Sequence, residues 1–140
     1  MIVYAESGAV LAWLLGEPSQ EQTLDILRRA ERVVASTLTG LECARGLARA
    51  KAANRISETD ELAALRLLDV AESTWDLLDL AGRVIEDARG AFPVEPVRSL
   101  DAIHLATALM FQEAFGPVVM LSFDDRIRAN ATALGLSVAG

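Results

Sequence analysis

Short, largely apolar segments alternate with helical stretches, and this alternation limits the fold more than any other feature of the sequence. Met1–Ala5, Arg32–Ala35 and Val118–Leu121 are brief runs rich in apolar, often β-branched residues. Runs without polar alternation are typical of strands that are buried on both faces of a sheet. Because helical patterns separate these runs, parallel pairing is favoured. The sequence therefore predicts an α/β domain in which helices cover a central parallel sheet.

Helix breakers and capping residues place the helices along the chain. Gly16 ends the first helix, Pro18 suits the first turn of the second, and Gly135 follows the last. Ser57–Asp60 resembles a capping box, and the prolines in "GAFPVEPVRS" make that segment a loop. We expect helices over Ser7–Leu15, Pro18–Ala30, about 37–53 (capped by Ser36 or Thr37), from Ser57 onward, and over Trp75–Ala88, Ser99–Ala114 and Asp124–Leu134. The sequence does not decide whether Glu72–Thr74 and Leu136–Val138 form short strands.

Length, charge and composition narrow the class of protein. The 140 residues, of which 52% are hydrophobic, suit one domain over 1–140 with a proper core. No apolar run approaches the roughly 20 residues that span a bilayer, and the start lacks a basic leader region, so we expect a cytoplasmic protein without a membrane partner. A single cysteine, Cys43, excludes an internal disulfide. The formal charge of −7 argues against a broad basic surface for nucleic acid, although divalent cations can bridge carboxylates and phosphates.

Five acidic residues stand where acids are unusual. Glu6 ends the first strand, and Asp124 and Asp125 follow the Val118–Leu121 strand. Glu42 and Asp101 lie among apolar residues near the starts of two helices. In open parallel sheets, ligands bind at the carboxyl ends of the strands, where the first three of these acids belong.

Two explanations of these acids remain open. Carboxylates in the first turn of a helix interact favourably with its dipole, so each acid alone is explained as a cap or a solvated charge. Together they indicate more, because buried carboxylates need partners and the chain has one lysine, Lys51, and no arginine obviously adjacent to each acid. Clustered carboxylate oxygens suit Mg²⁺ or Mn²⁺, which can activate water and stabilise charge on phosphorus.

The motifs around these acids resemble the PIN-domain family, and more narrowly the VapC-type toxins of bacterial toxin–antitoxin pairs. The opening Glu6-Ser7-Gly8-Ala9-Val10, followed by Gly16-Glu17-Pro18, is similar to the family's first strand–helix corner. A Ser/Thr-rich stretch, 36–39, precedes the helix that carries Glu42. "LDAIHLATAL", Leu100–Leu109, is the most specific match, and Ser122-Phe123-Asp124 and the later "ALGL" complete it. The resemblance covers nearly the whole chain.

This resemblance implies a three-layer α/β/α fold with a central parallel sheet of four or five strands. It implies a Mg²⁺- or Mn²⁺-dependent endoribonuclease that cleaves RNA of the tRNA or rRNA class, forms a homodimer and is neutralised by a cognate VapB-like antitoxin. The catalytic and metal-binding acids would be Glu6, Glu42, Asp101 and Asp124, supported by Ser7, Ser122 and Asp125. Arg45, Arg49 and Arg98 are the expected contacts to RNA phosphates, or else part of a solvated surface.

One position departs from the family pattern, because Glu6 stands where the family usually has aspartate. The extra methylene moves the carboxylate by roughly 1 Å, a distance to which catalytic geometry is sensitive. The alternative is therefore a catalytically attenuated domain that acts mainly as an antitoxin-binding module. A phosphorelay receiver domain also ends its strands with acids, but it needs a lysine near a late strand, and Lys51 lies early in the chain.

The remaining chemically notable residues have structural explanations. His104, the only histidine, lies three residues after Asp101 and shares its helix face, and we expect it to pack or to hydrogen-bond there. Cys43 is expected to be a small buried residue. Trp13 and Trp75 lie in apolar patterns and are expected in the core or in an interface.

Overall fold

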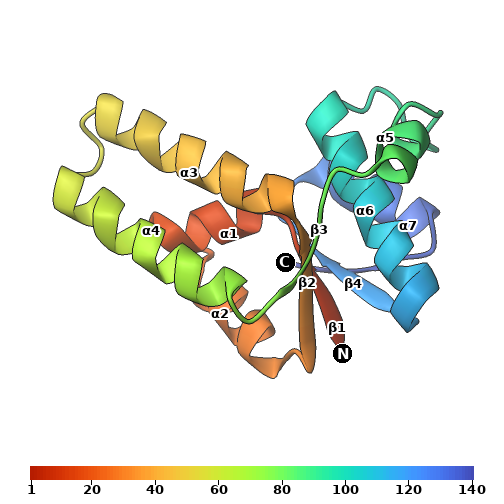
Figure 1. The fold of residues 1–140 in the computed structure, drawn as a ribbon, viewed down its shortest axis with the longest axis horizontal. Coiled ribbons are helices and arrows are strands. Elements are labelled where there is room, and N and C mark those ends of the chain that lie inside the picture. The colour runs from red at the N-terminus through yellow and green to blue at the C-terminus, as the bar shows by residue number, and fades with distance from the viewer.

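A five-stranded, wholly parallel sheet forms the centre of the computed structural model, which describes residues 1–140 (Figure 1). The strands are β1 (Ile2–Ala5), β2 (Arg32–Ser36), β3 (Asp76–Leu78), β4 (Val118–Leu121) and β5 (Ser137–Ala139). Their order is β3-β2-β1-β4-β5, so the N-terminal strand lies in the middle. The predicted fold class, with a parallel sheet of four or five strands, is confirmed with five.

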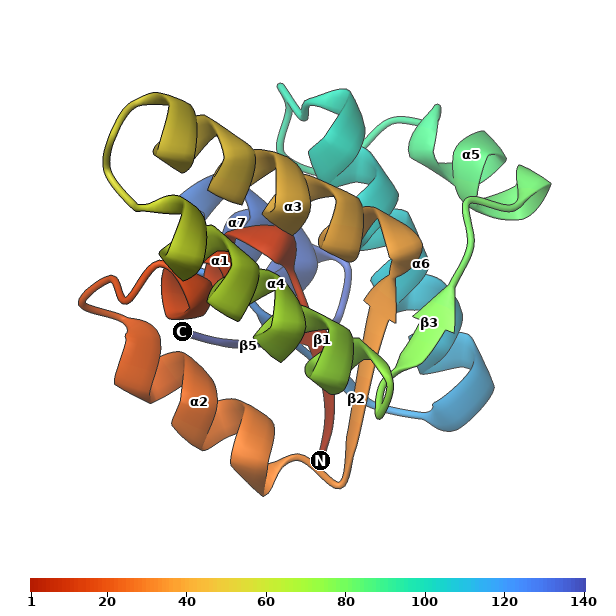
Figure 2. The same cartoon turned by 60° about the vertical axis from the view of Figure 1, so that its left-hand side comes forward.

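Seven helices cover the two faces of this sheet. They are α1 (Ser7–Leu14), α2 (Gln20–Arg29), α3 (Thr37–Ala52), α4 (Glu58–Glu72), α5 (Gly82–Ala88), α6 (Ser99–Phe115) and α7 (Asp125–Ala133). Helices α1 to α4 pack together on one face, and α5 to α7 on the other (Figures 1 and 2). None of the helices is both long and apolar enough to cross a membrane.

Side chains alternate in direction along β1, so this strand contributes to the hydrophobic core on both faces of the sheet. Tyr4 joins the cluster formed by Leu105 of α6 and Ile127 of α7. Val3 and Ala5 point the other way, toward α1 and its neighbours. Val3, Tyr4 and Ala5 are all fully buried, which explains why this strand carries no charged side chain before Glu6.

Most of the predicted helix and strand positions are confirmed, including the capping box at Ser57 and Asp60, the loop before α6 and the positive φ of Gly135 after α7. The helix expected over Trp75–Ala88 is wrong. Asp76–Leu78 instead pairs with β2 as an edge strand, and the helix begins only at Gly82. Pairing with β2 across the chain outweighed a local pattern that suits a helix. The expected cap at Ser99 is also wrong, because Arg98 occupies the N-cap position without a side-chain cap.

Candidate active site

Glu6 occupies the corner between β1 and α1, where it is the N-cap of the helix. Its Oε1 accepts hydrogen bonds from Gly8 N at 2.8 Å and Ser7 Oγ at 3.0 Å. Its Oε2 accepts a hydrogen bond from Ser122 Oγ at 3.0 Å, just beyond β4. The residue is 6% exposed and forms no ion pair with lysine or arginine. Glu6 is thus a nearly buried carboxylate that is held by polar groups and has no cation beside it.

Glu42 reaches the same region from the second turn of α3. Its Oε1 lies 2.6 Å from His104 Nε2 and 3.0 Å from Ser7 Oγ. Burial opposes ionisation of Glu42, but hydrogen bonds from His104 and Ser7, together with the nearby charge of Arg49, hold the pKa of this carboxyl below its ordinary value. Glu42 is therefore an ionised carboxylate near neutral pH.

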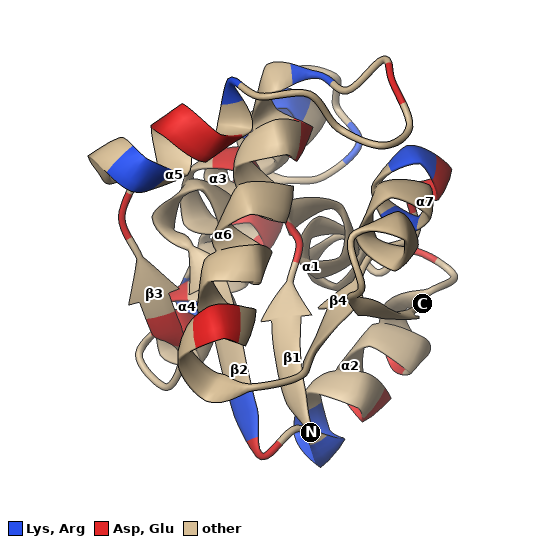
Figure 3. Ribbon diagram, turned by 90° about the vertical axis from the view of Figure 1, so that its right-hand side faces the viewer, with Lys and Arg blue, Asp and Glu red and all other residues tan.

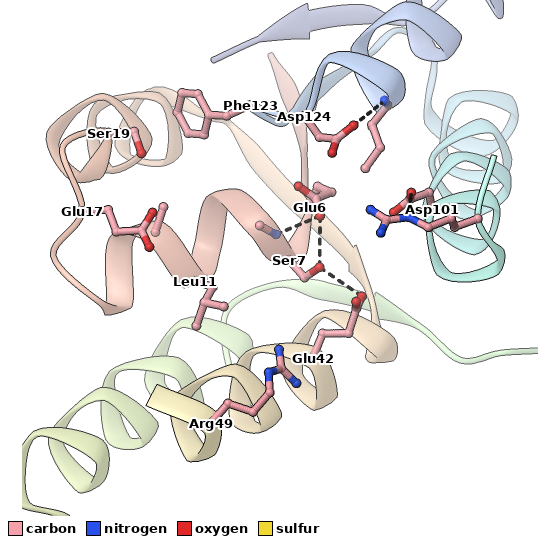
Figure 4. Close-up of a pocket in the computed structure, with 14 residues that line it drawn as sticks. Glu6, Ser7, Leu11, Glu17, Ser19, Glu42, Arg49, Asp101, Phe123 and Asp124 are labelled. Atoms are coloured by element: carbon pink, nitrogen blue, oxygen red, sulfur yellow. Dashed lines mark hydrogen bonds and ion pairs between the residues drawn. The ribbon is translucent and has the colours of Figure 1, made fainter. Parts of the chain in front are cut away.

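Ser7 joins the first two acids. Its Oγ, which carries a single proton, lies 3.0 Å from Glu6 Oε1 and 3.0 Å from Glu42 Oε1 (Figure 4). One hydroxyl can donate only one strong hydrogen bond at a time, so it cannot satisfy both carboxylates. The predicted supporting serines, Ser7 and Ser122, both contact Glu6, and each fixes one of its oxygens.

Behind Glu42 lies a buried pair, His104 of α6 and Tyr4 of β1. His104 is 1% exposed, and its Nδ1 lies 2.7 Å from the Tyr4 hydroxyl. An ionised Glu42 only accepts hydrogen bonds, which assigns the proton of a neutral imidazole to Nε2. Nδ1 then accepts from Tyr4, whose pKa is raised by burial and by the nearby charges of Glu6 and Glu42. The expectation that His104 hydrogen-bonds is confirmed, and it orients Glu42.

Asp124 and Asp101 complete the site from the other face of the sheet. Asp124 is the N-cap of α7, and its Oδ1 accepts from Arg126 N at 2.9 Å and Ile127 N at 3.1 Å. Asp101 lies in the first turn of α6, with its Oδ2 3.5 Å from Arg98 Nε. The expectation of no arginine beside the acids is thus wrong at this position.

The four predicted acids line one open hollow of about 410 Å³ (Figure 4). Glu6, Glu42, Asp101 and Asp124 come from the starts of four separate helices, and Ser7, Glu17, Arg49 and Arg98 also line the hollow. Ser122 lies beneath, fully buried. The two remaining predicted residues lie elsewhere: Asp125 is exposed on α7, and Arg45 lines a neighbouring groove with Leu41 and Leu100.

Two groups that hold the acids or their partners in place, Tyr4 and Gly8, are not indicated by the sequence motifs. Tyr4 could have been found, because a lone tyrosine within an apolar strand needs a buried partner for its hydroxyl. Gly8, whose backbone N–H donates to Glu6, offered no comparable sequence pattern. In the view of Figure 3, acidic and basic segments are interspersed over the helices.

The donor set fits a hard divalent cation. Glu42 Oε2, Asp101 Oδ1 and Asp124 Oδ2 make no hydrogen bond within the chain, so each acid keeps an oxygen for another partner. Oxygen ligands of this kind suit Mg²⁺ and Mn²⁺. No three acidic, histidine or cysteine side chains converge on a single point. Shared coordination would therefore require rotation of the less restrained side chains, and Glu6 is held most firmly.

The fold and the site together define a class: three-layer parallel α/β proteins with a carboxylate-lined site at the C-terminal edge of the sheet. The chain belongs to the PIN-domain family, whose model matches residues 3–133. The resemblance drawn from the motifs is thereby confirmed.

Proteins of similar sequence agree with this membership. Ribonuclease VapC46 of Mycobacterium tuberculosis is 35% identical over 97% of this chain and 95% of that protein. Ribonuclease VapC35 of the same species is 27% identical over 98% of this chain and 95% of that protein.

Solved structures share the fold at low sequence identity. A toxin–antitoxin complex from Klebsiella pneumoniae aligns with a TM-score of 0.65 and 15% identity, over 100% of this chain and 97% of that one. VapBC2 from Rickettsia felis, bound to a DNA fragment from its promoter, aligns with a TM-score of 0.64 and 12% identity, over 99% and 98%.

Proposed function

We propose that this protein is a VapC-type endoribonuclease toxin that uses Mg²⁺ or Mn²⁺. The observation that carries the proposal is the hollow lined by Glu6, Glu42, Asp101 and Asp124, three of which keep an unpartnered carboxylate oxygen. Membership of the PIN-domain family and 35% identity to a protein named ribonuclease VapC46 support the same activity.

Each residue of the site has a role that follows from its contacts. The four acids would hold the cation, which supplies positive charge for the phosphate and lowers the pKa of a bound water. Ser7 and Ser122 fix the Glu6 carboxylate, while His104 fixes Glu42. Arg49 and Arg98 line the same hollow, so their guanidinium groups can bind phosphates that flank the cleaved bond.

The attenuated-domain alternative is less well supported. Despite its extra methylene, Glu6 is anchored at the edge of the hollow and shares Ser7 with Glu42. Three of the four acids also keep a carboxylate oxygen that no group of the chain occupies, as a cation site requires.

The proposal extends to partners by similarity. Structural neighbours are toxin–antitoxin complexes, which supports a VapB-like antitoxin as a partner. A homodimer, an RNA substrate of the tRNA or rRNA class and a cytoplasmic location complete the proposal, with residues 1–140 as one domain.

Cleavage of total RNA tests the activity. We expect fragments with Mg²⁺ or Mn²⁺, none with excess EDTA, and a loss of at least about 100-fold for Asp101→Asn, because this change removes charge from the hollow without changing side-chain size. Asp79→Asn is the matched control, since Asp79 is exposed and does not line the hollow. Full cleavage by Asp101→Asn, or equal losses in both variants, would contradict the assignment.

A further inference from the structure

The side chain of Glu6 folds back over the first turn of its own helix. An ideal Cβ built on Gly8 would lie 3.0 Å from Glu6 Oε2, 3.4 Å from Oε1 and 3.6 Å from Cδ. A carbon–oxygen separation of 3.0 Å is tighter than ordinary van der Waals contact, so an alanine at position 8 would push against the carboxylate. The glutamate therefore occupies the space that a side chain on residue 8 would fill.

The carboxylate has little freedom to move away. Gly8 N holds Oε1 at 2.8 Å from below, Ser7 Oγ holds the same oxygen at 3.0 Å, and Ser122 Oγ holds Oε2 at 3.0 Å. Ser122 is itself fully buried and also accepts from Asp124 N at 3.2 Å. A displacement of a few tenths of an ångström would thus lengthen several hydrogen bonds at once, including one at the neighbouring strand end.

The backbone conformation at position 8 does not require glycine. Its φ is not positive, and it lies within α1, where glycine destabilises a helix relative to alanine. Glutamate is also outside the set of side chains that usually cap a helix, because Ser, Thr, Asp and Asn reach the N–H groups with shorter chains. The two unusual residues explain each other: the long side chain can cap the helix by curling over a residue that has no Cβ.

We propose that Gly8 is a positioning residue that makes room for a glutamate as the first carboxylate of the site. This inference rests on the proposed cation-binding function and deepens it. Gly8 sets where the Glu6 carboxylate stands relative to Glu42, Asp101 and Asp124. An aspartate at position 6, one methylene shorter, does not extend over residue 8 and has no need of the glycine.

A double-mutant cycle tests this coupling with four proteins: the native chain, Gly8→Ala, Glu6→Asp, and the double variant. Mn²⁺ affinity is measured by isothermal titration calorimetry, and Tm is measured without metal. Gly82→Ala is the matched control, since Gly82 also lies in the first turn of a helix and a Cβ there meets nothing within 4 Å. This control should leave Mn²⁺ affinity unchanged.

We expect Gly8→Ala to weaken Mn²⁺ binding by roughly 3- to 10-fold in the native background, given the sensitivity of such sites to sub-ångström displacement. In the Glu6→Asp background the same change should alter affinity by less than about 2-fold. Without metal, Gly8→Ala should raise Tm in the Glu6→Asp background, because alanine has a higher helix propensity than glycine. In the native background, which keeps Glu6, the same change should not raise Tm.

Equal effects of Gly8→Ala in both backgrounds, in affinity and in Tm, would overturn the proposal. If the native chain binds no Mn²⁺ at millimolar concentration, the proposed cation site fails instead. The metal-free Tm cycle then still decides whether Gly8 and Glu6 are coupled, so the two failures are distinguishable.

Discussion

Tyr4→Phe removes a buried hydroxyl that supports the acidic site. The ring of Tyr4 is fully buried and meets the His104 ring edge-on, with centroids 5.8 Å apart. Phenylalanine keeps this ring packing and removes only the hydroxyl that lies 2.7 Å from His104 Nδ1. Because His104 is 1% exposed, water cannot replace the lost donor.

The expected loss of stability follows from His104 Nδ1, the buried acceptor that is left without a hydrogen-bond donor. A buried acceptor that loses its partner costs about 1–3 kcal/mol of the free energy of unfolding. For a chain of this size, each kcal/mol lowers Tm by roughly 3 °C, so we expect Tm to fall by about 3–9 °C. The released imidazole also holds Glu42 less firmly through the 2.6 Å contact, and Mn²⁺ affinity should fall as well.

Thermal unfolding followed by circular dichroism measures the first effect, and calorimetric Mn²⁺ titration the second. Ser57→Ala is the control, because it removes the α4 capping box, costs about 1 kcal/mol and lies away from the hollow. It should lower Tm without changing Mn²⁺ affinity. A Tyr4→Phe protein as stable as the native one, or equal affinity losses in both variants, would refute the reasoning.

Three further outcomes are expected. Asp124→Asn should keep the α7 cap and its stability but lose Mn²⁺ affinity, whereas Asp124→Ala should also lose about 0.5–2 kcal/mol of unfolding free energy in urea titrations, because Oδ1 caps two backbone N–H groups. Burial and Asp69 raise the pKa of Glu72, so the folded state loses stability as pH rises through that pKa; Glu72→Gln should therefore raise Tm at pH 7 and leave it unchanged at pH 4. Mn²⁺ at about 100 times its Kd should stabilise the chain by about 2.7 kcal/mol, seen as a higher Tm that EDTA reverses.

The sequence was most informative where local and global preferences agree. β1, β2 and β4 are buried on both faces, so their apolar runs identify them without any knowledge of partners. The edge strand β3 escaped prediction because Asp76–Leu78 is short and largely exposed, and only pairing with β2 defines it. Its residues fit a helical pattern equally well when they are read alone.

For the site, sequence reasoning located the acids but not their arrangement. Glu6, Glu42, Asp101 and Asp124 stand out because each lies beside apolar residues at a helix start, and all four line one hollow. Asp125 could not be separated from Asp124 in the sequence, since only the helix geometry turns one inward and the other to solvent. The relation between Glu6 and Gly8 depends on the path of one flexible side chain, which no sequence pattern reveals.

The central place of β1 has a consequence for synthesis. Val3 pairs with Val33 on one side and with Val119 on the other, so the first strand made is completed by one of the last. Glu6 cannot meet Ser122 or Asp124 until nearly the whole chain has emerged from the ribosome. Until then, the acidic residues of the site lie on segments of the chain that have not yet come together.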